Sequence, residues 1–134
     1  MELKTTPIYA AILGLFFVYL SFLTIKARRK NKIAIGDGNN LALQRAIRIH
    51  GNFSEYAPLT ILLVSFVELL GYPHFLIHSL MFAFLIGRIS HLYGVSKPKE
   101  DFRFRVFGIA TTLSVIVISS ILILVNSILV TRFF

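Results

Sequence analysis

The sequence predicts an all-α integral membrane protein, a four-helix bundle forming one domain over residues 1–134. Hydrophobic residues make up 56% of the chain and charged residues only 15%, whereas a soluble domain carries about 25% charged residues. Three apolar stretches have about the length of a membrane-spanning helix, which needs about 20 mostly apolar residues, and a fourth reaches that length when it is extended backward over a polar half. The sequence contains no cysteine, which excludes a disulfide scaffold and a protein thiol acting as nucleophile.

The four helices are expected at residues 6–27, 41–70, 74–94 and 102–131. The apolar run from Ile8 to Ile25 is longer than the hydrophobic region of a signal peptide and lacks a small-residue cleavage site, so we interpret it as a retained helix. The second helix is apolar only from Leu59 to Leu70, and its first half is polar. The fourth helix is rich in Ile and Val, but its length and the need to satisfy backbone polar groups within lipid favour a helix.

Basic residues gather on one side of the predicted membrane. Seven Lys or Arg lie between positions 26 and 48 and five between 88 and 105, whereas only Lys4 and Arg132 lie on the other side. The positive-inside rule therefore places loops 1 and 3 in the cytoplasm and both termini outside. We expect a multi-pass protein of the bacterial inner membrane, or of the endoplasmic reticulum in a eukaryote. The basic first loop is expected to contact anionic lipid headgroups. The net charge of +8 would suggest a nucleic-acid partner in a soluble protein, but in a membrane protein it reflects the cytoplasmic excess of Lys and Arg, so no nucleic-acid partner is expected.

A stripe of polar residues runs along the predicted second helix. At spacings of 3, 4, 3 and 1 its members share one helical face and extend about 16 Å along the axis: Arg45, Arg48, Asn52, Glu55 and Tyr56. A charged side chain in the centre of the bilayer costs about 2.5–3.5 kcal/mol, so these groups must face protein or water and find partners. The stripe fits either a structural network, in which Glu55 neutralises Arg45 or Arg48, or a site for an anionic ligand.

The stretch from Arg45 to Pro58 has the pattern R-x-x-R-x-x-x-N-x-x-E-Y-x-P. It resembles the signature of the MAPEG family, the membrane-associated proteins in eicosanoid and glutathione metabolism, and every fixed position is present. The minimal loops are similar to those of bacterial microsomal glutathione transferase-like members. The resemblance implies a homotrimer that binds glutathione as cosubstrate between subunits. It implies four contacts from the second helix: Arg48, Asn52, Glu55 and Tyr56.

Four further residues are candidates for this site. Arg45 matches the first arginine of the signature, where a structural role is an alternative. His50 lies on another face than Arg48, so it either packs between helices or reaches the ligand of a neighbouring subunit. The segment from Gly87 to His91 is similar to the A-R-I-x-H segment of microsomal glutathione transferases. Arg88 then either faces the polar stripe of the second helix or extends to the membrane interface. His91 stands where some relatives have a tyrosine.

The start of the fourth helix offers the catalytic candidate. Relatives carry a catalytic arginine here, often as R-x-x-G, and Arg105 has that spacing to Gly108, with Arg103 as the fallback. An arginine beside a thiol stabilises the thiolate, the reactive nucleophile, and lowers the thiol pKa from about 8.5. The alternative is that both arginines only anchor the basic side of the protein.

The resemblance implies a detoxifying glutathione transferase or peroxidase acting on a hydrophobic electrophile or lipid hydroperoxide dissolved in the bilayer. Two alternatives remain: a non-catalytic protein that binds glutathione or lipid, and a small drug/proton exchanger with Glu55 as its coupling carboxylate. Near the second turn, Glu68 is expected to pair with His74 or His78 in a structural role. The two histidines are four residues apart, but without further ligands no metal site is expected.

Overall fold

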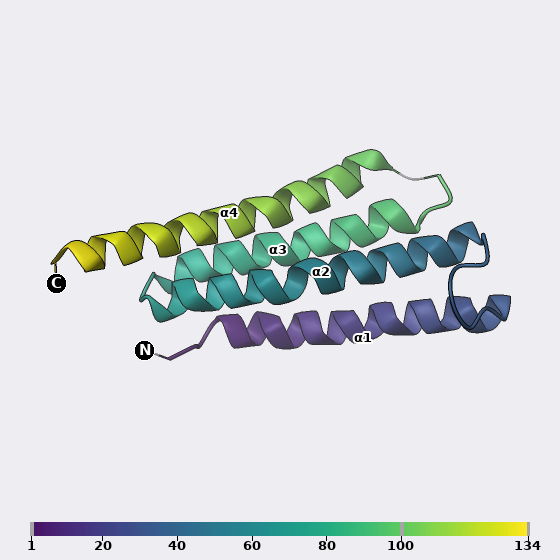
Figure 1. Cartoon of the computed structure of the whole chain (residues 1–134), viewed down its shortest axis with the longest axis horizontal. Coiled ribbons are helices and arrows are strands. Elements are labelled where there is room, and N and C mark those ends of the chain that lie inside the picture. The colour runs from purple at the N-terminus through teal and green to yellow at the C-terminus, as the bar shows by residue number, and fades with distance from the viewer. Residues whose placement is uncertain (1, 100, 134) are drawn as a thin grey trace.

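The computed structural model is helical throughout and describes residues 2–99 and 101–133, with positions 130–133 described by their backbone only. Its four helices run antiparallel in chain order (Figure 1): α1 (Thr6–Asn31), α2 (Leu41–Leu69), α3 (His74–Ser96) and α4 (Phe102–Phe133). α2 contacts each of the other three helices, and α3 packs most extensively against α4. The expected all-α membrane bundle is confirmed.

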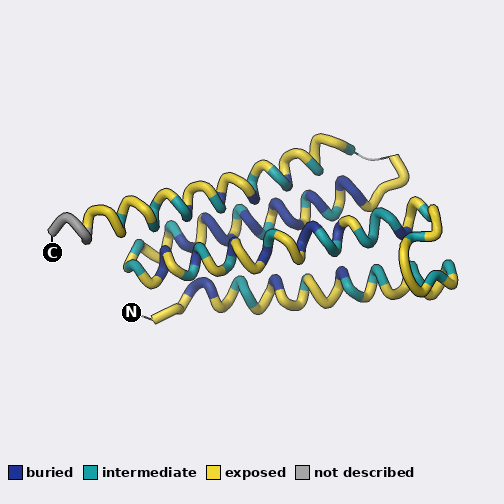
Figure 2. The backbone as a smooth tube through the Cα atoms, viewed as in Figure 1, coloured by how far each residue is buried: buried dark blue, intermediate teal, exposed yellow. Residues whose placement is uncertain are grey.

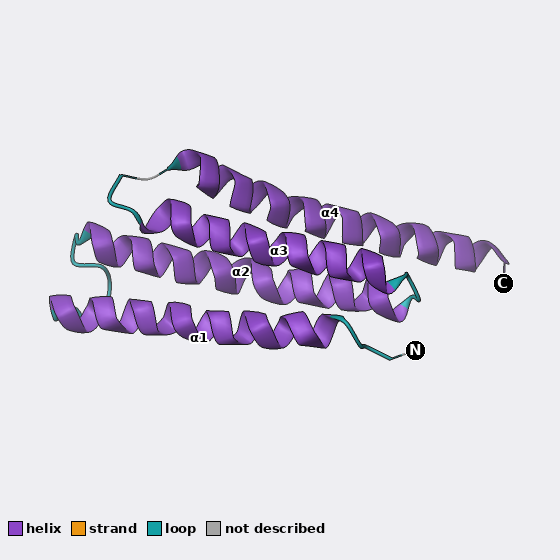
Figure 3. Ribbon diagram, turned by 180° about the vertical axis from the view of Figure 1, so that it is seen from behind, coloured by secondary structure: helices purple, strands orange, loops and turns teal. Residues whose placement is uncertain are grey.

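The two ends of the bundle differ in what they carry. The loops 32–40 and 97–101 lie together at one end, and both termini lie with the α2–α3 turn at the other (Figures 1 and 3). The first end therefore gathers the basic residues that follow α1 and α3, together with those that open α2 and α4.

Three of the helices are long and apolar enough to cross a membrane: Thr6–Asn31, His74–Ser96 and the part of α4 from Phe102 to Leu129. α2 does not meet that measure, because its first half carries the polar stripe, yet its 29 residues run alongside the other helices. Buried residues concentrate on α2 and α3, whereas α1 and α4 expose large apolar side chains such as Leu15 and Leu124 (Figure 2). Such continuous apolar surface suits contact with lipid.

Local capping explains where the helices start and end. α1 continues to Asn31, four residues past the predicted end, because Arg28, Arg29 and Lys30 in its last turn interact favourably with the negative end of the helix dipole. Asn40 starts α2, since its side-chain Oδ1 accepts the backbone N–H of Leu43 at 3.0 Å. α2 ends at Leu69, and α3 and α4 each run two residues beyond their predicted ends.

The start of α1 is capped by a residue of another helix. Thr5, the N-cap residue, makes no side-chain capping bond. The buried carboxylate of Glu68 instead accepts the backbone N–H groups of Lys4, Thr5 and Thr6 at 2.9, 2.6 and 2.8 Å. His74 lies 3.8 Å from the same carboxylate, as predicted, whereas the His78 ring bonds the Tyr9 hydroxyl at 3.2 Å. Glu68 therefore fixes α1 to the α2–α3 turn.

Glycines allow α3 and α4 to approach closely. A Cβ added to Gly108 would lie 2.7 Å from the Cβ of His91 and 2.9 Å from its backbone nitrogen. At Gly94 an added Cβ would lie 2.7 Å from the backbone nitrogen of Arg105. Small residues permit such contact between membrane helices, and it leaves no room for a ligand between these two backbones.

Candidate functional site

Three arginines converge on one hollow at the end of the bundle that carries loops 32–40 and 97–101. The hollow, which we call the basic hollow, has a volume of about 320 Å³ and is lined by residues of α2, α3 and α4: Leu41, Gln44, Arg45, Arg48, Val95 and Arg105. None of these residues is acidic. The hollow can therefore take an anionic ligand, and its volume lies at the lower end of the range for small-molecule sites.

Two loop contacts hold the arginines in place. Arg45 donates from Nη2 to the carbonyl oxygen of Pro98 at 2.7 Å, which ties α2 to the loop after α3. Asp101 accepts the backbone N–H of Arg103 through Oδ1 at 3.1 Å, and its carbonyl oxygen accepts the N–H of Arg105 at 3.4 Å. The start of α4 is thus fixed so that Arg105 lies opposite the first turns of α2.

Arg48 and Glu55 occupy the exposed edge of the polar stripe. They are seven residues apart, so they lie on nearly the same side of α2 with about 10 Å between them along the axis. Both side chains are exposed, and among the described residues neither forms an ion pair. The structural alternative in which Glu55 neutralises Arg45 or Arg48 is therefore not what the single chain adopts.

Asn52 faces the bundle interior rather than its surface. Its Oδ1 accepts a hydrogen bond from Nη1 of Arg88 at 2.8 Å, and Nη2 of Arg88 donates to the carbonyl oxygen of Gly108 at 3.2 Å. The Arg88 guanidinium also lies 5.8 Å from the ring centroid of Phe84. Only 2% of Arg88 is exposed, so this arginine links α2, α3 and α4 and does not extend to the membrane interface.

The other predicted site residues divide between two regions. Tyr56 is half-buried, one turn beyond Asn52 on α2. His91 is buried one turn beyond Arg88 on α3, where its backbone contacts Gly108 of α4. His50 instead faces α1, where its Nε2 lies 3.1 Å from the Ser21 hydroxyl and its ring lies 4.8 Å from that of Phe17. The structure thus places Tyr56 and His91 in the same part of the bundle as Asn52 and Arg88, and it places His50 at the contact between α1 and α2.

Arg103, the alternative to Arg105, points elsewhere. Its side chain is exposed and lines an apolar groove between α3 and α4 instead of the basic hollow. Two residues along a helix differ by about 200° in direction, which explains why Arg103 and Arg105 lie on different faces of α4. Of the two, only Arg105 joins the arginines of α2.

Gln44 and Val95 line the basic hollow but are not among the residues that the sequence predicts for the site. Gln44 directly precedes Arg45, and Val95 lies one helical turn beyond His91. Their spacing to these two predicted residues is the sequence feature that indicates a place in the site. Among the described residues no cluster of three or more His, Asp or Glu side chains could hold a metal ion.

Comparison with known proteins identifies the family of this chain. A family model described as the MAPEG family matches residues 6–125. Two proteins named inner membrane protein YecN, from Escherichia coli strain K12 and from E. coli O6:H1 strain CFT073, are each 36% identical over 107 residues, which are 80% of this chain and 80% of theirs. The family resemblance of the sequence is therefore confirmed: this membrane protein belongs to the MAPEG family.

Proposed function

We propose that this protein is a membrane-bound, glutathione-dependent transferase or peroxidase whose basic hollow binds the anionic groups of glutathione. The observation that carries the proposal is the convergence of Arg45, Arg48 and Arg105 on one hollow, whose lining residues in the described part of the chain include no acidic side chain. Family membership supports the proposal, and the charge of the hollow gives it a physical basis.

The chemical groups of glutathione match the charged residues in number and sign. The tripeptide carries two carboxylates, one ammonium group and a thiol. Arg45 and Arg48 bind carboxylates, for which the guanidinium offers two parallel hydrogen bonds. Glu55, which lies about 10 Å beyond Arg48 along the axis of α2, accepts the ammonium group. Asn52 is buried and its oxygen already accepts a bond from Arg88, so only its amide nitrogen is left for the contact with glutathione that the family signature implies.

Arg105 activates the thiol in this proposal. A guanidinium beside the sulfur stabilises the thiolate relative to the thiol. The thiol proton leaves to solvent, the sulfur forms a bond to the electrophilic carbon, and the leaving group departs with its bonding electrons. With a lipid hydroperoxide, the sulfur attacks the terminal oxygen and the O–O bond breaks, which leaves glutathione as its sulfenic acid. The departing lipid alkoxide takes a proton from solvent and leaves as the alcohol. A second glutathione then converts the sulfenic acid to a disulfide and water.

The proposal includes a homotrimer in which a neighbouring subunit covers the exposed edge of α2. Arg48 and Glu55 are exposed in the single chain, and charged groups facing lipid at this depth are costly. A neighbouring subunit, or glutathione bound beside it, supplies the missing partners. His50 contacts α1 of its own chain, so we do not assign it to a neighbour's site.

We further propose that loops 1 and 3 face the cytoplasm of a bacterium. Both loops lie at the basic end of the bundle, as the positive-inside rule requires, and the names of the E. coli relatives state an inner-membrane location. Cytoplasmic glutathione then enters the basic hollow directly, while hydrophobic substrates arrive through the bilayer.

Binding of glutathione to detergent-purified protein tests the proposal. We expect Arg48→Ala to weaken binding at least tenfold, because loss of two charge-assisted bonds costs roughly 2–4 kcal/mol. Arg29→Ala removes an exposed arginine from the end of α1 and should leave binding unchanged. Absence of glutathione binding to the unaltered protein contradicts the proposal. Binding without turnover of a chloro-nitro-aromatic acceptor or a lipid hydroperoxide identifies a non-catalytic binding protein.

A further inference from the structure

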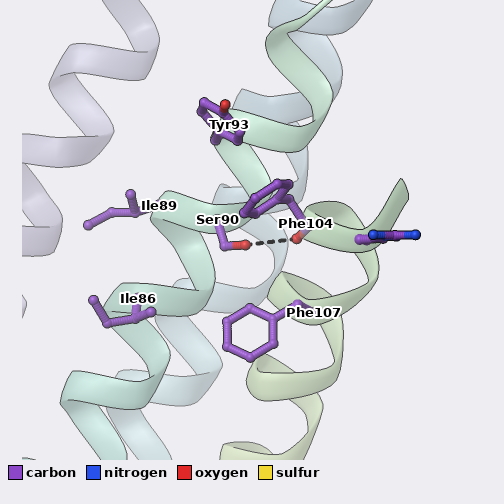
Figure 4. A pocket seen from close by; sticks show the side chains of 7 residues that line it. Ile86, Ile89, Ser90, Tyr93, Phe104 and Phe107 are labelled. Carbon is purple, nitrogen blue, oxygen red and sulfur yellow. Dashed lines mark hydrogen bonds between the residues drawn. The ribbon is translucent and has the colours of Figure 1, made fainter. Parts of the chain in front are cut away.

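An apolar groove runs between α3 and α4 on the outer side of the bundle (Figure 4). It has a volume of about 620 Å³, and its apolar walls come from Ile86 and Ile89 on α3 and Phe104 and Phe107 on α4. Ser90 also lines the groove, but its hydroxyl group points to α4 and donates to the carbonyl oxygen of Phe104 at 3.0 Å. The wall therefore offers hydrocarbon to its occupant rather than hydrogen bonds.

The groove is separated from the basic hollow by the contact between α3 and α4. Arg103, Phe104 and Phe107 line the groove, whereas Arg105 lines the hollow on another face of the same helix. Between them the backbones meet at Gly94, where an added Cβ would lie 2.7 Å from the nitrogen of Arg105. An occupant of the groove therefore does not reach Arg105, and the groove does not serve as the acceptor pocket of the proposed reaction.

Cations surround the end of the groove nearest loop 97–101. Arg103 lines both the groove and an adjoining polar hollow of about 420 Å³, to which Lys97 and Lys99 also contribute. Lys97 donates to the Tyr93 hydroxyl, and its Nζ lies 3.8 Å from the centroid of the Tyr93 ring, so the ammonium group is held at the end of the groove. Asp101 lines the adjoining hollow, where it caps the start of α4.

We propose that this groove binds an anionic phospholipid of the surrounding bilayer. One acyl chain lies along Ile86, Ile89 and Phe107, and the phosphate lies between Lys97 and Arg103. The argument is charge complementarity: the apolar wall accepts any acyl chain, whereas the cations at its end select a lipid with net negative charge. This inference is independent of glutathione chemistry, because it depends on the opposite face of α4.

The composition of the chain allows a direct test. The protein contains no tryptophan, so Phe107→Trp introduces a single fluorophore into the groove. Phe22→Trp introduces one on the exposed face of α1, near the basic residues that end that helix. Each variant is reconstituted in bilayers containing brominated phosphatidylglycerol or, at the same mole fraction, brominated phosphatidylcholine, and quenching of the tryptophan reports which lipid lies beside it.

We expect brominated phosphatidylglycerol to quench the Phe107→Trp variant with at least about threefold higher relative affinity than phosphatidylcholine, since each cation near a lipid surface contributes up to about fivefold. Adding Lys97→Gln and Arg103→Gln should abolish the preference, whereas adding Arg29→Gln and Lys30→Gln should preserve it. The Phe22→Trp variant should show a smaller preference. Ile89→Trp repeats the measurement from α3, should the substitution at Phe107 disturb folding.

Three results overturn the proposal. Equal quenching by both lipids shows that the groove does not select charge. Loss of the preference with the control pair at Arg29 and Lys30 shows general attraction to a basic protein instead of a site. Protection of both groove tryptophans from every brominated lipid shows that protein, such as a second copy of this chain, covers the groove.

Discussion

Arg88 of α3 donates a hydrogen bond to the side-chain oxygen of Asn52 on α2, at 2.8 Å and across 36 positions of sequence. Its second donated bond goes to the carbonyl oxygen of Gly108, and no carboxylate among the described residues forms an ion pair with it. A buried cation is costly unless its donors are satisfied. Asn52 is therefore a structural partner in the fold as well as a residue of the proposed glutathione site.

Replacing Asn52 by alanine should destabilise the protein. The substitution leaves a donor of the buried Arg88 guanidinium without its acceptor, which costs about 2–4 kcal/mol. Thermal unfolding in detergent, followed by circular dichroism, measures the loss. Asn52→Asp retains an acceptor and should be milder. Unchanged stability of Asn52→Ala together with lost glutathione binding would show that Asn52 acts only as a ligand contact.

Replacing Gly108 by alanine should separate α3 from α4. The added Cβ meets the backbone nitrogen of His91 at 2.9 Å, and a backbone atom cannot move aside as a side chain can, so we expect a loss of about 1–3 kcal/mol. Gly14→Ala is the matched control: Gly14 is also helical but has no atom within 4 Å of its added Cβ, and alanine there should be neutral or stabilising. Equal effects of the two substitutions on unfolding would contradict the close contact.

Replacing Glu68 by glutamine should loosen the first turn of α1. Three backbone N–H groups lose an ionised acceptor at the positive end of the helix dipole, and we expect a loss of about 1–3 kcal/mol. Hydrogen exchange at Lys4, Thr5 and Thr6 should accelerate. Glu2→Gln changes an exposed carboxylate that lies 3.9 Å from the Lys4 ammonium group, and it should have little effect on the exchange rates. Protection that persists in Glu68→Gln argues against the cap.

Arg105→Ala and Arg103→Ala should differ in their effect on the thiol of bound glutathione. Arg105 lines the basic hollow and Arg103 lies on another face of α4. Without Arg105, the pH at which the thiolate appears, followed by its ultraviolet absorbance, should rise toward about 8.5, and kcat/KM should fall about 100-fold if the loss resembles removal of one stabilising donor. Arg103→Ala should change neither quantity. The reverse pattern would assign the role to Arg103.

Much of the fold could be predicted because each helix is specified locally. Asn40 begins α2 through its own side chain, and the apolar runs predict three spans that the structure contains. The sequence predicts an end of α1 four residues before the observed one at Asn31, because a basic cluster favours both a cytoplasmic loop and a last helical turn. The polar stripe was correctly placed on α2, but helical spacing could not show that Asn52 is buried while Glu55 is exposed.

The tertiary contacts that shape the site are not encoded by local pattern. The Arg88–Asn52 bond joins residues on different helices. Arg103 and Arg105 line different hollows because α3 packs against α4 between the two faces on which they lie. His50 is the clearest case: nothing in the signature indicates that its ring packs on Phe17 of α1.

The contact between Glu68 and the start of α1 also determines when the first helix becomes fixed during biosynthesis. The first helix leaves the ribosome with three amide donors whose acceptor is made more than 60 residues later. Until the α2–α3 hairpin has inserted, these donors must be satisfied by interfacial water. A nascent chain arrested before position 68 should therefore hold its first helix at a variable depth, and insertion of the α2–α3 hairpin, which carries Glu68, then fixes that depth.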